Sequence, residues 1–258
     1  MGYKPSESDL KDEYISQRLQ EISPGIDGGV IYDILKKIVE ISPLLLALVH
    51  AEADDIIKRT TQSCMDRGLL GLSAWDVARP DSAKEMVIMK VGYLTWRTNA
   101  PVYIVHVRSS LGLEAVRNGR TLGTTIIAEP YPHYLSLTHV DTNEDLETFE
   151  RVATPVRRKR DVEVLWEGIR DGTISSIGTD HSAKPRSAKT KDIRSSILGM
   201  PGLETTLPIY EIFKGEEIVR LASLSSKFLQ LFDVSRREEW NFMATQEEGF
   251  TWTFRGWR

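Results

Sequence analysis

The stretch VYIVHVRSSLGLEAV, residues 102–116, decides the fold class of this chain. It opens with the apolar run 102–105, typical of a strand buried on both faces, and then passes through His106 into a helical pattern. An equivalent unit lies upstream, where the run LLLALV at 44–49 is followed directly by His50. Buried strands that alternate with helices predict a parallel sheet.

Two further apolar runs, at 124–128 and 173–178, extend the series and end at Glu129 and Asp180. Helical patterns surround the four runs, and helices are expected at 28–42, 53–68, 82–98, 111–119, 142–152, 161–171, 202–213 and 215–231. Two architectures of the α/β class fit this order: a doubly wound open sheet, or part of an eight-stranded α/β barrel. No glycine-rich phosphate loop follows any of the runs, which argues against a dinucleotide-binding fold.

The composition is that of an ordinary globular protein. With 41% hydrophobic and 27% charged residues among 258, a disordered or collagen-like chain is excluded. The single Cys64 excludes a disulfide scaffold and suits a reducing compartment. The net charge of −4 argues against a nucleic-acid partner, and the basic run at 157–160 is interpreted as a solvated helix start. Since no apolar run reaches the ~20 residues that span a membrane, and the N-terminus has no apolar signal core, we expect a cytoplasmic protein without a membrane partner.

Polar side chains at the ends of the predicted strands form the candidate site. His50, His106 and Asp180 each follow a buried strand, and we expect them to converge because the carboxyl ends of parallel strands meet at one face. Imidazole and carboxylate are good zinc ligands, zinc lowers the pKa of a bound water to about 7, and Asp180 would take the proton. The alternative, that each residue is a hydrogen-bonded part of the core or rim, stays open on the pattern alone. His133 and His139 are interpreted as structural or surface residues. His181, which follows Asp180, is interpreted as a residue that supports the metal ligands or contacts substrate.

Five segments stand out as a set: LVHAEADDII (48–57), YIVHVRSSLGLEAV (103–116), AEPYPHYLSLT (128–138), LWEGIRDGTISSIGTDHSAK (165–184) and GMPGLETTLPIYE (199–211). Together they resemble the cyclic amidohydrolases, on the hydantoinase and dihydropyrimidinase branch, with allantoinases and dihydroorotases as more distant relatives. The resemblance implies a (β/α)8 barrel of the TIM type, of which only strands five to eight are present. It divides the chain into a loop or insertion at 1–25, the partial barrel at 26–232, and a tail at 233–258 that looks like a remnant of the family's C-terminal region.

The resemblance also implies roles for individual residues. His50 and His106 match the histidines that hold one metal ion, zinc or another divalent ion, of a binuclear centre. Asp180 matches the aspartate that binds the other ion and acts as the catalytic base. Tyr3 matches the tyrosine that contacts substrate and stabilises the oxyanion, while Thr154 and Leu198 fall at substrate-binding positions, where Leu198 offers only backbone groups.

The chain departs from the family pattern in its metal ligands. It has no His-x-His pair, and the family's carboxylated lysine is not present in this chain. We therefore expect that a missing barrel half lies on another chain, that two copies pair as a homo-oligomer, or that the chain is a truncated product. On its own, the chain is expected to hydrolyse hydantoin or dihydrouracil poorly or not at all.

Three functions are open at this point. The first is metal-dependent hydrolysis of the cyclic amide C–N bond in a hydantoin-like or dihydropyrimidine-like ring. The second is a catalytically incomplete homologue that serves assembly, and the third is a mononuclear metalloenzyme of other specificity. The strands at 44–49 and 173–178 are expected to be sheet edges, buried against another chain or covered by the tail that carries Trp240, Trp252 and Trp257.

Overall fold

A parallel three-stranded sheet lies at the centre of the protein. The computed structural model describes residues 26–71, 74–139, 151–189, 196–203 and 205–206. The strands are β1 (Ala47–Val49), β2 (Val102–Ile104) and β3 (Ile126–Ala128), in the order β1-β2-β3. Leu48 lies opposite Tyr103, which in turn lies opposite Ile127. The parallel α/β sheet expected from the sequence is therefore confirmed.

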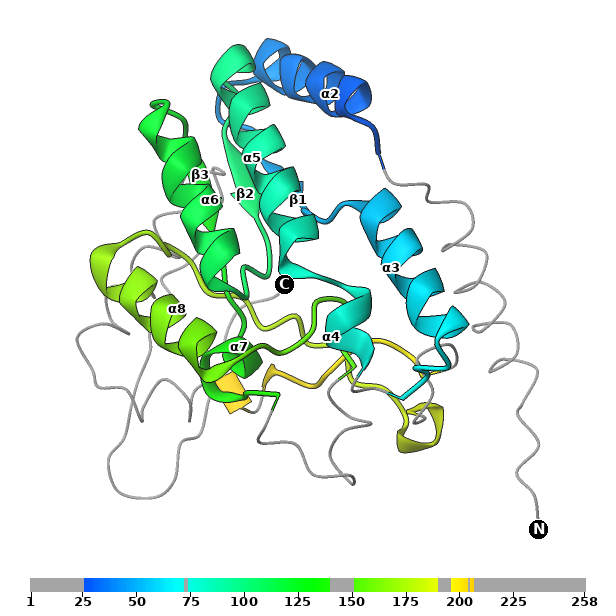
Figure 1. Cartoon of the computed structure of the whole chain (residues 1–258). Coiled ribbons are helices and arrows are strands. Elements are labelled where there is room, and N and C mark those ends of the chain that lie inside the picture. The colour runs from blue at the N-terminus through cyan, green and yellow to red at the C-terminus, as the bar shows by residue number, and fades with distance from the viewer. Residues whose placement is uncertain (1–25, 72–73, 140–150, 190–195, 204, 207–258) are drawn as a thin grey trace, which may run out of the picture.

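Helices cover one face of this sheet. Figure 1 shows α5 (Asp81–Thr98) and α6 (Ser110–Thr121) side by side in front of the strands, with α2 (Gly28–Ile41) against α5 and α8 (Lys159–Asp171) against α6. The remaining helical segments are α3 (Asp54–Asp66), α4 (Trp75–Ala78), α7 (Pro132–Ser136) and a 3-10 turn at Arg186–Ala188. None of the described helices is long and apolar enough to cross a membrane.

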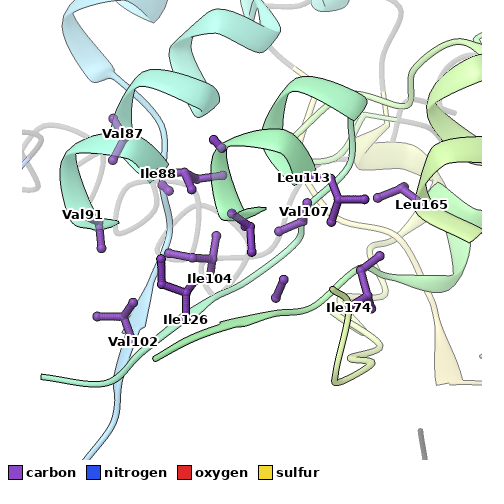
Figure 2. Close-up of a cluster of buried hydrophobic side chains, with 14 of the residues drawn as sticks. Val87, Ile88, Val91, Val102, Ile104, Val107, Leu113, Ile126, Leu165 and Ile174 are labelled. Atoms are coloured by element: carbon purple, nitrogen blue, oxygen red, sulfur yellow. The ribbon is translucent and has the colours of Figure 1, made fainter. Parts of the chain in front are cut away.

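The hydrophobic core fills the space between these helices and the sheet. Figure 2 shows apolar side chains of the helices facing those of the strands, and the labelled ones are Val87, Ile88, Val91, Val102, Ile104, Val107, Leu113, Ile126, Leu165 and Ile174. Two glycines allow α5 and α6 to approach each other closely. A Cβ on Gly92 would lie 3.3 Å from Cα of Gly119, and a Cβ on Gly119 would lie 2.5 Å from Cδ1 of Ile126. The space that two side chains would need is therefore taken by backbone and by Ile126.

The opposite face of the sheet is open at β1. Successive side chains of a strand point to opposite faces, and Leu48, which points away from the helices, is 68% exposed. Leu44 just before the strand is 60% exposed. Burial of the run 44–49 on both faces was therefore a wrong prediction for the described structure, because nothing in the described part of the chain covers this face. Among the residues that the structure describes, β1 is an edge strand of the sheet, as expected.

The expected fourth strand at 173–178 is not a regular strand. The segment runs beside the end of β3, where N–H of Ser175 donates to the carbonyl of Ala128 and N–H of Gly178 donates to that of Pro130, both at 3.3 Å. N–H of Ile174 donates instead to the carbonyl of Gly168, at 2.8 Å. The ladder is too sparse to form a strand because one of its donors is used by the end of α8.

Local capping sets the helix boundaries. The Asp27 carboxylate accepts from the backbone N–H groups of the first turn of α2, and α8 ends at Gly172, whose φ of 82° is left-handed. Helix α5 begins at Asp81 after Pro80, one residue earlier than expected. The short helices α4 and α7 were not expected from the sequence. Several predicted segments lie wholly or largely outside the described residues: 1–25, 142–152, 202–213, 215–231 and 233–258.

The basic run at 157–160 precedes and begins α8 as expected, but its first residue is not solvated. Arg157 is buried, ion-paired with Asp76, and its Nε lies 2.8 Å from Oδ1 of Asp81. It also donates to the backbone carbonyl of Arg79. Burial lowers the pKa of Arg157 to about 10. The run therefore contributes one buried cation to the interior instead of a fully solvated face.

Candidate functional site

Two histidines meet at the carboxyl ends of β1 and β2. His50 follows the last residue of β1 directly, and His106 lies two residues beyond β2. Nε2 of His106 is 2.6 Å from Nδ1 of His50, and the two rings meet edge-on with centroids 4.4 Å apart. His106 is only 4% exposed, whereas the side chain of His50 is 47% exposed. The convergence expected for these two side chains is therefore present.

Strained backbone marks two of the predicted site residues. Among the described non-glycine residues, only His106 (φ 45°), Asp180 (φ 43°) and Asn99 (φ 58°) adopt the left-handed conformation. Asn99 is the C-cap of α5, an ordinary place for it. His106 is different, because the backbone N–H groups on either side of it are both bonded: that of Val105 donates to the carbonyl of Val49 in β1, and that of Val107 to the carbonyl of Glu129 just after β3. Such conformations cost ~1–3 kcal/mol and cluster at functional sites.

Glu52 fixes the orientation of His50. Its Oε2 lies 3.0 Å from Nε2 of His50, and it also accepts from Arg79 and, at 3.3 Å, from Nη1 of Arg108. Burial raises the pKa of the Glu52 carboxyl, but the hydrogen bond to His50 and the charges of Arg79 and Arg108 outweigh it and hold this pKa far below its usual range. Glu52 is therefore a buried carboxylate anion that binds one ring nitrogen of His50.

Lys84 contacts the other side of the pair. Its Nζ lies 2.9 Å from Nδ1 of His106 and donates to the carbonyl of Val105 at 3.3 Å. The side chain comes from the first turn of α5 and is fully buried. Burial and the charge of Arg108 lower the pKa of Lys84 to about 7. Burial and the charge of Lys84 hold the pKa of His106 well below its ordinary value, so this imidazole is neutral.

Two carboxyl groups lie at the strand ends, and one of them, Asp180, interacts electrostatically with His50. Partial burial raises the pKa of Asp180, and the neighbouring His50 opposes this effect. Burial and the negative charge of Asp180 raise the pKa of Glu129 to about 7, against the opposing effect of the hydrogen bond with Tyr103. Tyr131 has its ring 5.7 Å from that of His106, and burial together with these two carboxylates raises its pKa as well. Imidazole, carboxyl and phenol groups thus gather at the strand ends.

The predicted substrate contacts are not joined to the pair by any described contact. Thr154 is fully buried, its hydroxyl contacts that of Tyr134, and the Tyr134 hydroxyl donates to the carbonyl of Thr154 at 2.8 Å. Leu198 packs against the small cluster that contains Trp75. Tyr3 lies outside the described residues.

The remaining histidines have local structural contacts. His133 is buried among tyrosines, and burial lowers its pKa to about 3. The backbone N–H of His139 donates to the backbone carbonyl of Arg157 at 3.0 Å, as expected for a structural residue. Nδ1 of His181 accepts from the backbone N–H groups of Gly202 and Leu203, at 3.2 and 3.3 Å. His181 therefore ties the segment after Asp180 to the segment at 202–203.

Sequence reasoning assigned no role to Glu52, Glu129, Tyr131 or Lys84. A signal existed for three of them, because Glu129 directly follows the third strand, and Glu52 and Tyr131 each lie two residues beyond a strand-end residue. No such signal exists for Lys84. It lies 22 residues before His106 on a separate helix, and no sequence pattern distinguishes a buried lysine in a first helical turn from a solvated one.

The side chains that the structure describes do not fit a complete metal site. Two imidazole nitrogens that share a tetrahedral zinc at ~2.0–2.1 Å lie about 3.3 Å apart, whereas those of His50 and His106 are 2.6 Å apart and hydrogen-bonded to each other. His50 fits the role of a ligand, because its second nitrogen bonds a carboxylate. His106 does not, because its second nitrogen faces Lys84. No group of three or more His, Cys, Asp or Glu side chains is placed to hold a metal ion within the described ranges.

Known proteins share this sequence and fold over part of their length. The chain is 30% identical over 181 residues to a dihydroorotase of Acetivibrio thermocellus, a match that covers 68% of this chain and 41% of the relative. It is 28% identical to an allantoinase of Solibacter usitatus, with coverage of 80% and 45%. The structure of an L-hydantoinase (dihydropyrimidinase) from Arthrobacter aurescens superposes with a TM-score of 0.67 at 26% identity, over 72% of this chain and 41% of that one. No protein-family model matches.

The chain spans less than half the length of the curated relatives it matches. The fold that it shares with the hydantoinase structures is an α/β fold with a parallel sheet. Over the residues that these comparisons cover, the chain shares the sequence and fold of cyclic amidohydrolases, with a dihydroorotase and an allantoinase as curated relatives and hydantoinases as structural neighbours.

Proposed function

We propose that the chain takes part in the hydrolysis of a cyclic amide C–N bond, in a ring of the hydantoin or dihydropyrimidine type. The observation that carries this proposal is the meeting of His50 and His106 at the ends of adjacent parallel strands, in a chain whose relatives bear the names of cyclic amidohydrolases. The strained backbone at His106 and Asp180 supports it, because such strain persists only where the surrounding structure holds it.

The residue roles in this proposal follow the family resemblance. The resemblance assigns the binding of zinc or another divalent ion to His50, His106 and Asp180, although the contact of His106 with Lys84 does not fit a ligand. Asp180 is also the proposed proton acceptor. Tyr3, Thr154 and Leu198 are the proposed substrate contacts, the last through its backbone. Hydrolysis adds water across the ring C–N bond, so that oxygen joins the carbonyl carbon and a proton joins the nitrogen. The exposed position of Asp180 and its electrostatic interaction with His50 support this role as proton carrier.

An assembly larger than the described part of this chain belongs to the same proposal. We propose that β1, β2, β3 and the segment 173–178 correspond to strands five to eight of an eight-stranded barrel. The open edge of β1 and the exposed Leu48 support a further strand that packs there, from a second copy of this chain or from another chain. Cytoplasmic location is proposed on the single Cys64, which is buried and unbridged.

The test is an activity assay on the native assembly, purified through a tag on this chain. Ring opening of hydantoin, dihydrouracil, dihydroorotate and allantoin is followed with added zinc. The proposal expects turnover of at least one ring, loss of it in Asp180→Asn, and no change in Asp33→Asn. Asp33 is a matched control because it is exposed on α2, away from the site. No turnover of any ring would overturn the proposal.

A second candidate is a catalytically incomplete homologue that serves assembly. Lys84 at Nδ1 of His106 favours it, since metal-binding histidines almost always donate this proton to an acceptor. The incomplete ligand set of the described residues points the same way. Under this candidate, the native assembly has no turnover and the Asp180→Asn variant assembles like the wild type.

A further inference from the structure

A one-directional chain of hydrogen bonds runs through the histidine pair. A lysine ammonium has three N–H donors and no acceptor, so Nδ1 of His106 accepts from Lys84 at 2.9 Å. The neutral ring then carries its proton on Nε2, which donates to Nδ1 of His50 at 2.6 Å. Nε2 of His50 in turn donates to the Glu52 carboxylate at 3.0 Å. Lys84, His106, His50 and Glu52 thus form a hydrogen-bonded relay.

The relay uses every imidazole lone pair that it contains. The lone pair of His106, on Nδ1, accepts from Lys84, and the lone pair of His50, also on Nδ1, accepts from His106. A metal ion binds an imidazole only through such a lone pair, and the second nitrogen of a metal-bound ring donates to a carboxylate or a carbonyl. His50 already has such a partner in Glu52, whereas His106 has a donor in that position.

We propose that Lys84 weakens divalent-metal binding by this pair, because it holds His106 with its proton on the nitrogen that faces His50. The inference rests on the proposed function only in taking His50 and His106 as ligand positions. It assigns to Lys84 the part of a residue that sets metal affinity through His106 without touching the ion.

The surroundings of Lys84 keep it in this role. Its side chain is fully buried and Nζ has two described acceptors, Nδ1 of His106 and the carbonyl of Val105. The nearby Glu52 carboxylate is already bound by Arg79, Arg108 and His50. The ammonium therefore has no competing carboxylate contact within the described part of the chain that would draw it away from the ring.

Substitution of Lys84 reverses the effect. Lys84→Gln offers an amide oxygen that accepts from Nδ1–H of His106, and Lys84→Met removes the donor without adding an acceptor. Partners of this kind change metal affinity by about 10- to 100-fold. We expect Lys84→Gln to raise the affinity for Zn²⁺ by about that factor, and Lys84→Met to raise it less. Lys90→Gln, on the exposed side of the same helix, is the matched control and should leave the affinity unchanged.

The experiment titrates Zn²⁺ into the full chain at about pH 6.5 by calorimetry, for the wild type and for the three variants. His106→Asn in the Lys84→Gln background must abolish the gain. Equal affinity in wild type and folded Lys84→Gln would overturn the inference. Nitrogen-15 NMR of the histidine rings in the wild-type chain keeps the test decisive if the variants fail to fold. It should find the proton of His106 on Nε2, and a proton on Nδ1 would overturn the inference.

These readouts separate the inference from the proposed function. Tight Zn²⁺ binding to the wild-type chain through His106 would overturn the role of Lys84 while the proposed hydrolysis stands. Raised affinity in Lys84→Gln, together with a native assembly that opens none of the four rings, would confirm the role of Lys84 and remove the proposed hydrolysis.

Discussion

Replacement of Glu129 by Gln should change how the stability of the protein depends on pH. Glu129 follows β3, is 8% exposed, and burial raises its pKa from 4.5 to about 7. The unfolded chain releases this proton near the ordinary value, and the folded chain keeps it until about pH 7. The folded state therefore binds more protons in this window, and its stability falls as the pH rises through it.

The size of the effect follows from the displacement of the pKa. Each pKa unit corresponds to about 1.36 kcal/mol, so the ionised Glu129 costs the folded state about 3 kcal/mol above pH ~7 and nothing below pH ~4. The amide of Gln stays neutral throughout and lacks this cost. Relative to the wild type, Glu129→Gln should therefore gain about 3 kcal/mol in the free energy of unfolding between pH ~4 and pH ~8.

Urea denaturation at several pH values measures this difference, with the fluorescence of the buried Trp75 and Trp166 as the signal. Glu163→Gln is the matched control, because Glu163 is exposed on α8, and its difference from the wild type should not vary with pH. If the difference between Glu129→Gln and the wild type is also the same at all pH values, the argument for a buried, protonated Glu129 is wrong.

Two further substitutions test the packing and the open edge. Gly119→Ala should destabilise the protein by ~1–3 kcal/mol, because its Cβ would lie 2.5 Å from Ile126 in a filled core. Gly28→Ala is the control and should not destabilise it, because the nearest atom to its Cβ would be 3.6 Å away. Thermal unfolding at a lower temperature for Gly28→Ala than for Gly119→Ala would contradict the packing argument. Leu48→Asp should reduce self-association, or association with another chain, in sedimentation without loss of stability, because Leu48 is 68% exposed on an edge strand. Leu122→Asp is the control, since Leu122 is 45% exposed beyond the end of α6. Equal sedimentation of both variants and the wild type would contradict the edge argument.

The order of elements was predictable from the sequence because periodicity reports burial. The run at 102–105 is continuously apolar, and β2, which forms its first three residues, has Val102 and Ile104 fully buried. The run at 44–49 has the same character, yet Leu48 is exposed. An apolar run predicts that its side chains are buried, but it does not identify the segment or the chain that buries them.

The fourth strand shows a second limit. The segment 173–178 has strand-like composition, but N–H of Ile174 pairs with the end of α8 and only two described backbone bonds join the segment to β3 and Pro130. Whether such a segment forms a regular ladder is decided by competition between nearby acceptors. A pattern of residue types contains no information about that competition.

The histidine pair was predictable and its partners were only partly so. The meeting of His50 and His106 follows from the geometry of parallel strands, which needs only their positions after two buried runs. Lys84 comes from a helix that packs over the sheet, so its contact with His106 depends on tertiary structure alone. It is this contact that decides which nitrogen of His106 carries the proton.

Incorporation of heavy oxygen from water into a ring-opened product tests the central claim most directly. The native assembly is incubated in heavy-oxygen water with the four cyclic amides, and mass spectrometry detects the product. Hydrolysis at the proposed site places one heavy oxygen atom in the new carboxylate. We predict this product from the wild type and from Asp33→Asn, and none from Asp180→Asn. An equal yield from Asp180→Asn, or no labelled product from the wild type, would contradict the claim that the strand-end site of this chain takes part in opening the ring.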